Sequence, residues 1–430
     1  MIIVDTALRE RERAGRPVRV GVFGAGSMAR GFVNQVTNAV PGMVVAAISN
    51  RTVGRAVDAF RFAGASTPAV VVDNLAALGA AVAAGRPAVT DNPVLLAQCE
   101  QIDCLIDITG AMEFGAAIAL EAIANGKHMV LMNAEIDATI GPILHDRARA
   151  AGVIFTCVDG DQAGVQMNLY RSVQSLGMVP RVLGTVKGLH DEYRTPTTEA
   201  VSAERWNQNV TMATSFADGS RVNFEQSIVA NATGFTVAQR GMLRYDHSGH
   251  VDGLATRYDL DMLRGVGGIV EFVVGAKPAG GVFCLAEQPD ARQLQYLERY
   301  TLGTGPLYAF YHPYHLCHLE APLTVARVVL FGDACGQPLA GPAVEVIAVA
   351  KRDLRAGETL DSYGQYMTYG QAEKAAVVQR ERLIPEGLVA GCRLLRDLPR
   401  DTALRWDDVE APSDQLAHRL YAEQQRRFPV

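Results

Sequence analysis

The 430-residue sequence predicts an α/β protein, with a doubly wound parallel sheet of the Rossmann type, a second α/β domain and a small β-rich domain. Up to about residue 157, short β-rich apolar runs alternate with alanine-rich helical stretches. This pattern is typical of a parallel sheet whose strands are connected by crossover helices. A Gly-x-Gly turn follows the first of these runs. Because the chain is too long for one ordinary core, two or three domains are expected.

The composition is that of a globular protein, with 49% hydrophobic and 20% charged residues and a net charge of −6. Nucleic-acid binding is not expected, because the only basic run, residues 9–13, alternates arginine with glutamate. No apolar stretch approaches the ~20 residues that span a bilayer, so we expect a cytoplasmic protein that does not enter a membrane. Seven scattered cysteines without a C-x-x-C pair argue against a disulfide framework and against a zinc ribbon.

Six apolar runs are expected to form the parallel sheet of a first domain, residues 1–164. The intervals between them hold helical material, for example at 114–125 and 142–151. The runs lack polar alternation, as expected for strands covered by helices on both faces. They are residues 18–23, 44–49, 69–72, 104–108, 128–132 and 153–157.

The remaining chain predicts two further domains. Residues 165–332 form a domain for substrate and subunit contacts, with a helix at 307–330 that packs back on the first domain. Its exposed sheet would make a homodimer natural. A linker rich in glycine and proline leads to a third domain, residues 343–430, where Ala348 to Asp361 is echoed by Cys392 to Asp407. Each copy contains Arg-Asp-Leu between two expected strands, which indicates a small β-rich unit. The strands expected in the second domain are 182–189, 227–237, 268–274 and 280–285.

The glycine turn predicts a nicotinamide dinucleotide site. Gly24 permits a tight turn, Gly26 lets a pyrophosphate approach the backbone, and the small Ala29 and Gly31 let the following helix pack closely on the sheet. The free N–H groups and the positive dipole end of that helix attract phosphate. A purely structural glycine turn is the alternative. The expected contact residues are Gly24, Gly26, Ser27, Met28 and Ala29.

The end of the second run predicts a preference for NADP(H). NAD-preferring sites usually place an acid there to hold the ribose hydroxyls, whereas this chain has Asn50 and Arg51. A neutral Asn50 does not repel a 2′-phosphate, and the guanidinium of Arg51 can pair with one. The alternative is that Arg51 only caps the next helix. Two later strand ends are expected to contact the ribose and nicotinamide, through Thr109, Gly110, Asn133 and Glu135.

Several polar residues are candidates for the chemistry. Asp159 and Asp161 follow the sixth run, where they bind a divalent ion, orient a lysine or cap the next helix. Lys187 ends a strand before the polar stretch 188–198, so we expect it to polarise a carbonyl or donate a proton, unless it is a surface lysine.

Three histidines at three-residue intervals, His312, His315 and His318, suggest one helix face and a possible metal site. Pro313 and the absence of an H-E-x-x-H pattern argue against zinc. We therefore expect His315 to bind substrate or to hydrogen-bond.

Taken together, these motifs make the sequence similar to the homoserine-dehydrogenase-related oxidoreductases that carry a C-terminal SAF (antifreeze-like) domain. Within them it most resembles the deoxyxylulose-5-phosphate reductoisomerase-like family. The resemblance covers nearly the whole chain, and its more specific parts lie after the glycine turn. The segments that carry it are residues 20–26, 158–161, 187–191, 305–308 and 313–316, with the Arg-Asp-Leu echo.

This resemblance implies that NADPH is used to convert 1-deoxyxylulose 5-phosphate into methylerythritol phosphate for isoprenoid biosynthesis. Lys187 and His190 would then polarise the ketose carbonyl or move protons. A divalent ion, Mg²⁺ or Mn²⁺, on Asp159 or Asp161 would hold the two oxygens of an α-hydroxyketone. The substrate phosphate would be bound by Arg194, Thr197 and Arg240.

Three alternatives stay open. Homoserine dehydrogenase is a weaker match, because it usually has an Asn-Lys pair where this chain has Asn133 and Ala134, and because it carries an ACT domain or none in place of SAF. A second alternative is an oxidoreductase of another sugar acid or polyol phosphate. The third is a non-catalytic NADP-binding sensor, since fold alone does not exclude one.

Overall fold

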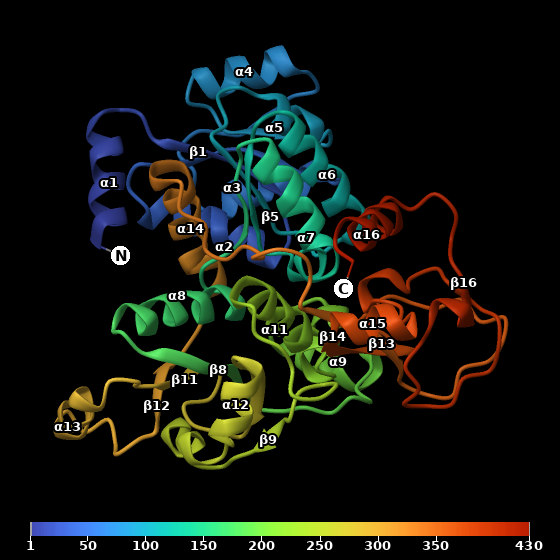
Figure 1. The fold of residues 1–430 in the computed structure, drawn as a ribbon. Coiled ribbons are helices and arrows are strands. Elements are labelled where there is room, and N and C mark those ends of the chain that lie inside the picture. Colours follow the sequence, from blue (N-terminus) through green and yellow to red (C-terminus); the bar gives the residue numbers. More distant parts are fainter. Residues whose placement is uncertain (1, 430) are drawn as a thin grey trace. The chain divides into compact units, whose positions relative to one another are not determined.

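The computed structural model describes residues 2–429, and the chain folds into two compact units (Figure 1). Unit 1 contains the residues up to Asp137, with Ile143–Asp161 and Leu316–Gln337. Unit 2 contains Ala138–Pro142, Gln162–His315 and the residues from Pro338 onward. Within residues 2–429, no helix combines the length and the apolar character needed to traverse a bilayer.

Unit 1 is built on a seven-stranded parallel sheet, which confirms the predicted Rossmann-type fold. The strand order is β3-β4-β2-β1-β5-β6-β7. Six strands match the predicted runs, and the seventh, β4, was not predicted. The strands are β1 (Val18–Phe23), β2 (Met43–Ser49), β3 (Val70–Val71), β4 (Ala88–Thr90), β5 (Cys104–Asp107), β6 (His128–Leu131) and β7 (Phe155–Cys157).

The helices α1 (Ile2–Arg13), α2 (Ser27–Ala39), α3 (Val53–Phe62), α4 (Leu75–Ala83), α5 (Val94–Gln98), α6 (Met112–Ala124) and α7 (Ala134–Ala150) connect these strands or precede them. Helix α14 (Cys317–Phe331) joins unit 1 from much later in the chain and packs on α2. Val325 and Val328 of α14 enter the same core as Phe32 and Val33 of α2. A Cβ atom on Gly31 would lie 2.6 Å from the His318 ring, so Gly31 makes room for α14. The sequence analysis expected it to make room for the sheet.

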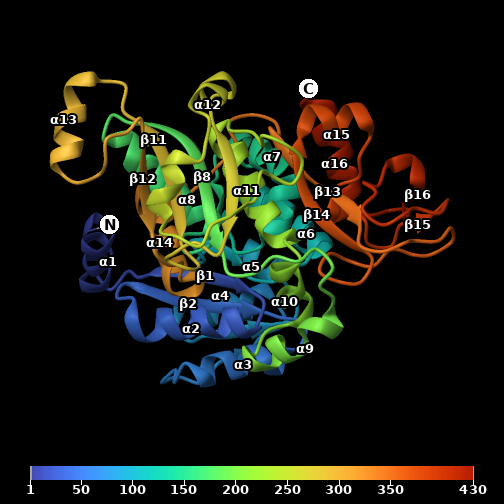
Figure 2. The ribbon, with the colours of Figure 1, turned by 90° about the horizontal axis from the view of Figure 1, so that it is seen from below.

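Unit 2 contains a mixed five-stranded sheet in the order β12-β11-β8-β10-β9. Strand β8 is parallel to β10 and antiparallel to β11. The helices α8 and α11 pack against this sheet (Figure 2). The strands are β8 (Val179–Lys187), β9 (Tyr245–Asp246), β10 (Ile269–Val274), β11 (Val282–Glu287) and β12 (Leu307–His312), and the helices are α8 (Gln162–Ser175), α9 (Pro196–Arg205), α10 (Val210–Ala217), α11 (Ser220–Thr233), α12 (Leu260–Val266) and α13 (Ala291–Arg299).

The strands expected at 182–189, 268–274 and 280–285 correspond to β8, β10 and β11, whereas one further predicted element was wrong and another was right only in part. The strand expected at 227–237 is the second half of α11, in which every residue from Ser220 to Ala232 is buried, so that no helical periodicity of polar residues marks it. The helix expected at 307–330 is the strand β12 followed by α14, because residues 307–312 complete the sheet edge beside β11. Helix α9, which begins near the end of the polar stretch 188–198, and helix α10, which follows it, were not predicted.

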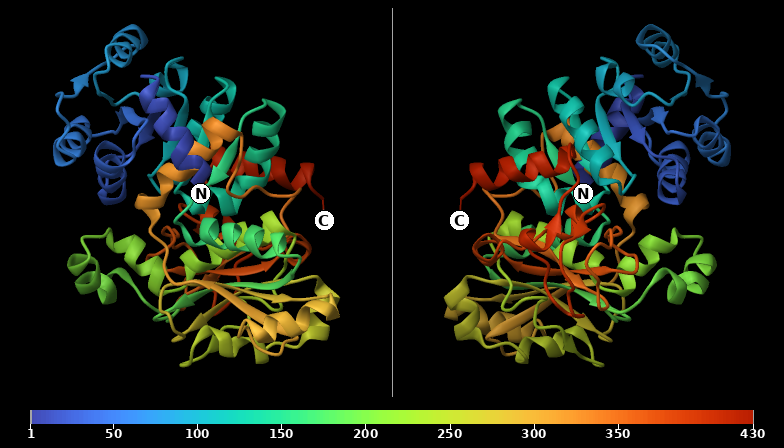
Figure 3. Two further views of the ribbon diagram at one scale, coloured as in Figure 1. Left: turned by 90° about the vertical axis from the view of Figure 1, so that its left-hand side faces the viewer. Right: turned by 90° about the vertical axis from the view of Figure 1, so that its right-hand side faces the viewer.

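The C-terminal residues 343–430, predicted as a third domain, lie in the same compact unit as residues 162–315. Strands β13 (Val344–Ala350) and β14 (Thr368–Lys374) are antiparallel and pack on α11 (Figure 3). The two Arg-Asp-Leu copies pair with each other, since Leu354 donates its N–H to Leu398 at 2.8 Å and Leu398 returns one at 3.0 Å. The other elements are α15 (Ala375–Glu381), β15 (Arg393–Leu394), β16 (Val409–Glu410) and α16 (Leu416–Arg427).

Candidate functional site

The glycine turn of unit 1 has the geometry of an anion-binding site. Gly24 has a φ of +105°, and a Cβ atom there would lie 3.2 Å from the Ile108 carbonyl oxygen, so another residue would be strained. Gly26 is the N-cap of α2 and supplies no side-chain cap, while Ser27 and Met28 are exposed. The first N–H groups of α2 are therefore available to a phosphate.

Asn50 and Arg51 follow β2, the strand next to β1, and Arg51 presents an exposed guanidinium there. Asn50 donates its side-chain N–H to the Thr52 carbonyl at 2.8 Å, which fixes the turn. Arg51 is exposed, and within residues 2–429 no hydrogen bond or ion pair engages its side chain. Arg51 is thus accessible to a ligand, and no carboxylate occupies the position of the usual ribose-binding acid.

The ends of β5 and β6 share a buried polar network that the sequence did not reveal. The Asp107 carboxylate accepts hydrogen bonds from the Thr109 hydroxyl at 2.6 Å and from the Asn133 amide at 2.9 Å. Burial raises the pKa of Asp107, and these bonds oppose the rise. Asn133 also caps α7 and is fully buried, as is Glu135. The side chains of Thr109 and Asn133 are therefore engaged within the protein, and Gly110 lies in the turn after β5 with a φ of +65°.

Asp159 is not placed as the predicted metal ligand or catalytic acid. It is 1% exposed, and its carboxylate accepts hydrogen bonds from Arg327 at 2.9 Å and from the Thr324 hydroxyl at 2.8 Å. Both partners belong to α14, so Asp159 anchors that helix to the end of β7. Asp161 is buried just before α8. Across residues 2–429, no group of three or more His, Cys, Asp or Glu side chains is arranged to hold a metal ion.

In unit 2, Lys187 and His315 line one cavity with a volume of about 420 Å³. Lys187 reaches it from the end of β8, and the helices α9 and α10 form a wall on which apolar side chains predominate. The cavity is lined by Gln162, Val186, Lys187, Gly188, Leu189, Glu199, Ser202, Trp206, Gln208, Ala213, Phe216, Ala217, Gly280 and His315.

The surroundings of Lys187 favour a less basic amine. Its side chain is 9% exposed, and its ammonium lies 5.3 Å from the centre of the Phe216 ring. Burial lowers the pKa of Lys187, the charge of Glu225 opposes this shift, and that of Arg221 adds to it. Arg221 and Glu225 form an ion pair of 2.8 Å on α11. A lysine whose pKa is lowered in this way can donate a proton at a lower pH than an exposed one.

His315 is held through Gln162. The Thr185 hydroxyl donates to the Gln162 side-chain oxygen at 2.9 Å, which leaves the Gln162 amide to face His315 Nε2 at 3.3 Å. Gln162 thus links His315 to the strand β8 through Thr185. The predicted common helix face of the three histidines does not exist, because His312 ends β12 and His318 lies in α14.

His190 does not share the cavity of Lys187. It lines a second cavity of about 360 Å³ together with Arg240, Arg244 and Glu192. His190 Nε2 lies 3.0 Å from the Glu192 carboxylate, which also contacts Arg244. The hydrogen bond from His190 lowers the pKa of Glu192 to about 2, although partial burial opposes this. The predicted joint action of Lys187 and His190 on one carbonyl is thus not supported by their positions.

The three predicted phosphate ligands are engaged with protein groups. Arg194 bonds Asp191 at 3.0 Å and Glu199 at 3.1 Å, and Thr197 shares a hydrogen bond of 2.9 Å with the Tyr366 hydroxyl. Arg240 pairs with two acids, at 2.8 and 3.4 Å, which are Glu373 and Glu381. None of the three lines the cavity of Lys187.

Sequence reasoning missed several residues of that cavity. Gln162 was passed over because a glutamine at the start of a helix has no distinctive pattern. Trp206 was detectable, since one of only two tryptophans lies in an otherwise polar stretch.

Comparison with known proteins gives a family for part of the chain. No curated protein matches the sequence. Among solved structures, myo-inositol dehydrogenase from Lactobacillus casei, in complex with NAD(H) and myo-inositol, is 17% identical with a TM-score of 0.30. The match covers 42% of this chain and 49% of that enzyme, so the chain spans about half of its length.

The 3-ketoreductase KijD10 from Actinomadura kijaniata, in complex with NADP and TDP-benzene, is 15% identical with a TM-score of 0.39, and the match covers 74% of this chain and 91% of that one. Residues 160–321, which include Lys187, His315 and the whole cavity around them, match the family described as "Oxidoreductase DRL, catalytic domain". This match supports the predicted class of protein, because residues 160–321 are similar to the catalytic domain of an oxidoreductase.

Proposed function

We propose that this oxidoreductase uses NADP(H) to reduce the carbonyl group of a small substrate. The observation that carries the proposal is the uncapped N-terminus of α2 after the Gly24 turn, together with the exposed, unpaired guanidinium of Arg51 after β2. A helix N-terminus binds a pyrophosphate, and an arginine in place of an acid favours the 2′-phosphate of NADP(H).

The residues of unit 2 suit the other half of the reaction. When bound, NADPH supplies the hydride. Lys187 hydrogen-bonds the substrate carbonyl oxygen, stabilises the negative charge that develops there and donates the proton that completes the alcohol. Gln162 hydrogen-bonds His315, and His315 orients a substrate hydroxyl. The apolar wall that includes Trp206 and Phe216 excludes water from the reacting carbonyl.

For the substrate, we propose 1-deoxyxylulose 5-phosphate, which the enzyme would isomerise and reduce to methylerythritol phosphate. The support is the sequence resemblance, whose specific segments 187–191, 305–308 and 313–316 fall within the matched catalytic domain. Arg194, Thr197 and Arg240 are engaged with protein groups and do not line the cavity. Among residues 2–429, Lys187 is the one lysine or arginine that lines it.

The test is a comparison of substrates with the purified protein. NADPH oxidation is measured with 1-deoxyxylulose 5-phosphate, and NADP⁺ reduction is measured separately with homoserine. The proposal expects turnover in the first assay and none in the second. Turnover of homoserine alone would replace the substrate assignment. Tight NADPH binding without turnover of either substrate, or of a panel of sugar acids and polyol phosphates, would favour a sensor.

A further inference from the structure

Helices α9 and α10 form a hairpin, residues 196–217, that builds much of the substrate cavity. Seven of the fourteen residues that line the cavity belong to it: Glu199, Ser202, Trp206, Gln208, Ala213, Phe216 and Ala217. The hairpin is unevenly buried: α10 is buried or half-buried throughout, whereas α9 is largely exposed, with Val201 at 78% and Trp206 after it at 65%. Its position therefore depends on how its ends and one side are held.

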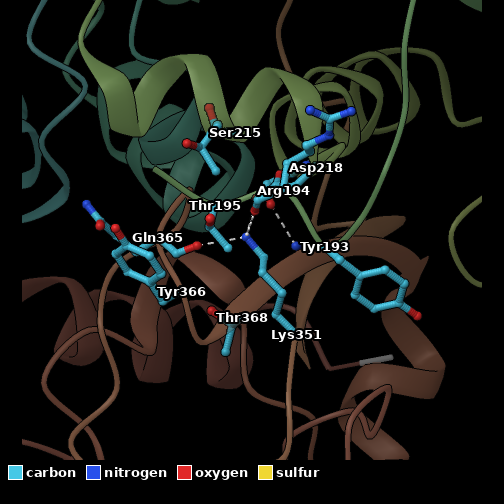
Figure 4. Close-up of polar contacts among 12 residues, drawn as sticks. Tyr193, Arg194, Thr195, Ser215, Asp218, Lys351, Gln365, Tyr366 and Thr368 are labelled. Atoms are coloured by element: carbon cyan, nitrogen blue, oxygen red, sulfur yellow. Dashed lines mark hydrogen bonds and ion pairs between the residues drawn. The ribbon is translucent and has the colours of Figure 1, made fainter. Parts of the chain in front are cut away.

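Both ends of the hairpin are held by one ammonium group from the C-terminal segment. Lys351 follows β13 and donates three hydrogen bonds of 2.8 Å each. One goes to the carbonyl of Arg194, directly before the N-cap of α9, and one to the carboxylate of Asp218, directly after α10. The third goes to the carbonyl of Gln365 in the same C-terminal segment (Figure 4). A lysine has three N–H donors, so this one is fully used.

The loop between β13 and β14 contacts the hairpin along its side. Gln365 donates to the Thr211 hydroxyl at 2.6 Å, and the Tyr366 hydroxyl lies 2.9 Å from that of Thr197. Gly364 lies so close that a Cβ atom on it would be 2.3 Å from the Thr211 carbonyl oxygen. These contacts reach both helices of the hairpin, and Lys351 joins them to its two ends.

The ion pair at the centre of these contacts is fully enclosed. The side chains of Lys351 and Asp218 are 2% and 0% exposed. Asp218 also accepts the N–H of Ser220 at 2.8 Å, in the first turn of α11, the helix that carries Arg221 and Glu225. Buried ion pairs contribute little net stability compared with apolar side chains, but their directional bonds can specify one arrangement of the chain. An arrangement that serves only stability would not need this charge.

We propose that Lys351 is a positioning residue for the substrate cavity: by fixing Arg194 and Asp218 it sets the place of the α9–α10 hairpin, which makes the C-terminal segment part of the substrate site. The inference deepens the proposed function and rests on it for the identity of the cavity. It assigns Lys351 no contact with substrate. Its effect passes through the cavity wall that contains Trp206 and Phe216.

The first test does not depend on activity. Hydrogen–deuterium exchange is measured by mass spectrometry on the full chain, as wild type, as Lys351→Met and as Lys374→Met. Lys374 ends the neighbouring strand β14, and no side-chain hydrogen bond engages it among residues 2–429, so it is the matched control. In Lys351→Met, amides of residues 196–217 are expected to exchange about ten-fold faster or more, while those of β1, β5 and β8 keep their protection. Unchanged exchange in 196–217, or faster exchange throughout, would overturn the proposal.

The second test uses kinetics with the substrate that the wild type turns over. Lys351→Met is expected to raise KM about ten-fold, to change kcat much less and to leave the Kd of NADPH unaltered, because the affected wall binds substrate. A fall in kcat at constant KM would contradict the positioning role. Absence of turnover by the wild type would count against the proposed function alone. The exchange experiment does not depend on turnover, so it would still test the positioning role of Lys351.

A double variant covers the case in which Lys351→Met does not fold. Lys351→Met with Asp218→Asn leaves no unpaired buried charge, so the chain is expected to fold. The bond to the Arg194 carbonyl is still lost in this variant, and faster exchange of 196–217 is still expected. Wild-type protection in the double variant would show that Lys351 only neutralises Asp218, which would overturn the proposal.

Discussion

At the scale of single residues, Lys187 combines three conditions that a proton donor in a reductase needs. It is buried at the end of a strand, it lines a cavity, and its pKa is lowered by burial although Glu225 opposes the shift. Only the ammonium form both stabilises negative charge on a carbonyl oxygen and can protonate it. The fraction of the ammonium form falls as the pH rises through the lowered pKa of Lys187. The alkaline decline of activity is therefore expected at a pH below 10.5, the ordinary pKa of a lysine.

Substitution of Lys187 separates its two roles. Lys187→Met is expected to lower kcat about 100-fold or more, because both the positive charge and the proton are lost. Lys187→Arg keeps the charge but does not release a proton near neutral pH, so KM is expected to stay close to that of the wild type while kcat falls. The pH profile of kcat is the decisive measurement. If the alkaline decline persists unchanged in Lys187→Arg, another group causes it.

Arg51 is expected to set the choice of cofactor. Arg51→Ala should weaken NADPH binding about ten-fold or more and leave NADH binding nearly unchanged, since only NADPH carries the 2′-phosphate. Arg55→Ala is the control, because Arg55 is also exposed and lies one turn further on in α3. Fluorescence titration with both cofactors gives the two Kd values. Equal losses for NADPH and NADH would mean that Arg51 does not contact the phosphate.

At the scale of the elements, the start of α11 depends on a glycine. Gly219 has a φ of +87°, and a Cβ atom there would lie 2.3 Å from the ring of His190, which is itself buried. The turn that presents Asp218 to Lys351 and Arg221 to Lys187 therefore needs both the left-handed backbone and the empty space.

Substitution of Gly219 tests these two requirements against a matched glycine. Gly177 also has a positive φ, +76°, but a Cβ atom there would meet nothing within 4 Å. Gly177→Ala is expected to cost about 1 kcal/mol of unfolding free energy through backbone strain alone. Gly219→Ala should cost clearly more, and His190→Ala should recover part of the difference in a double-mutant cycle measured by chemical denaturation. Equal costs would show that His190 moves away freely.

The strands of unit 1 were predictable because parallel strands covered on both faces are continuous apolar runs bounded by turns. The same burial made α11 unpredictable, since a helix buried on all sides has no polar face. Within the site, the glycine turn and Lys187 could be predicted, because the turn directly follows one predicted strand and Lys187 ends another. Asp107 with Asn133, and Lys351 with Asp218, join residues far apart in the sequence, and only the fold brings them together. The homodimer and the cytoplasmic location stay predictions from the sequence.

At the scale of the whole molecule, stability is expected to depend on pH through a buried carboxyl group. Burial raises the pKa of Glu345 to about 7, although hydrogen bonds from Tyr421 and Gln425 oppose the rise. The folded state thus binds this proton more tightly than an unfolded chain with the ordinary pKa of 4.5. The contribution is fully present below pH 4.5, declines as the pH rises towards 7 and is lost above it, by about 3 kcal/mol in total.

Glu345→Gln removes this titration. The variant is expected to be more stable than the wild type at pH 8, by roughly 1–3 kcal/mol, and to show a smaller decline between pH 5 and pH 8. Glu410→Gln, on the exposed end of β16, is the control and should leave the pH dependence unchanged. Urea denaturation across this pH range measures both effects. A decline as steep in Glu345→Gln as in the wild type would assign it to other groups.

The arrangement around Lys351 has a consequence for the evolution and redesign of the enzyme. The ammonium nitrogen of Lys351 binds the chain immediately before α9 and immediately after α10. The distance between the two ends of the hairpin is therefore set by Lys351. Side chains of residues 196–217 that contact neither Lys351 nor residues 364–366 can then vary while Lys187, α11 and the sheet stay in place. Hairpins grafted from related oxidoreductases would transfer substrate preference without rebuilding the catalytic group.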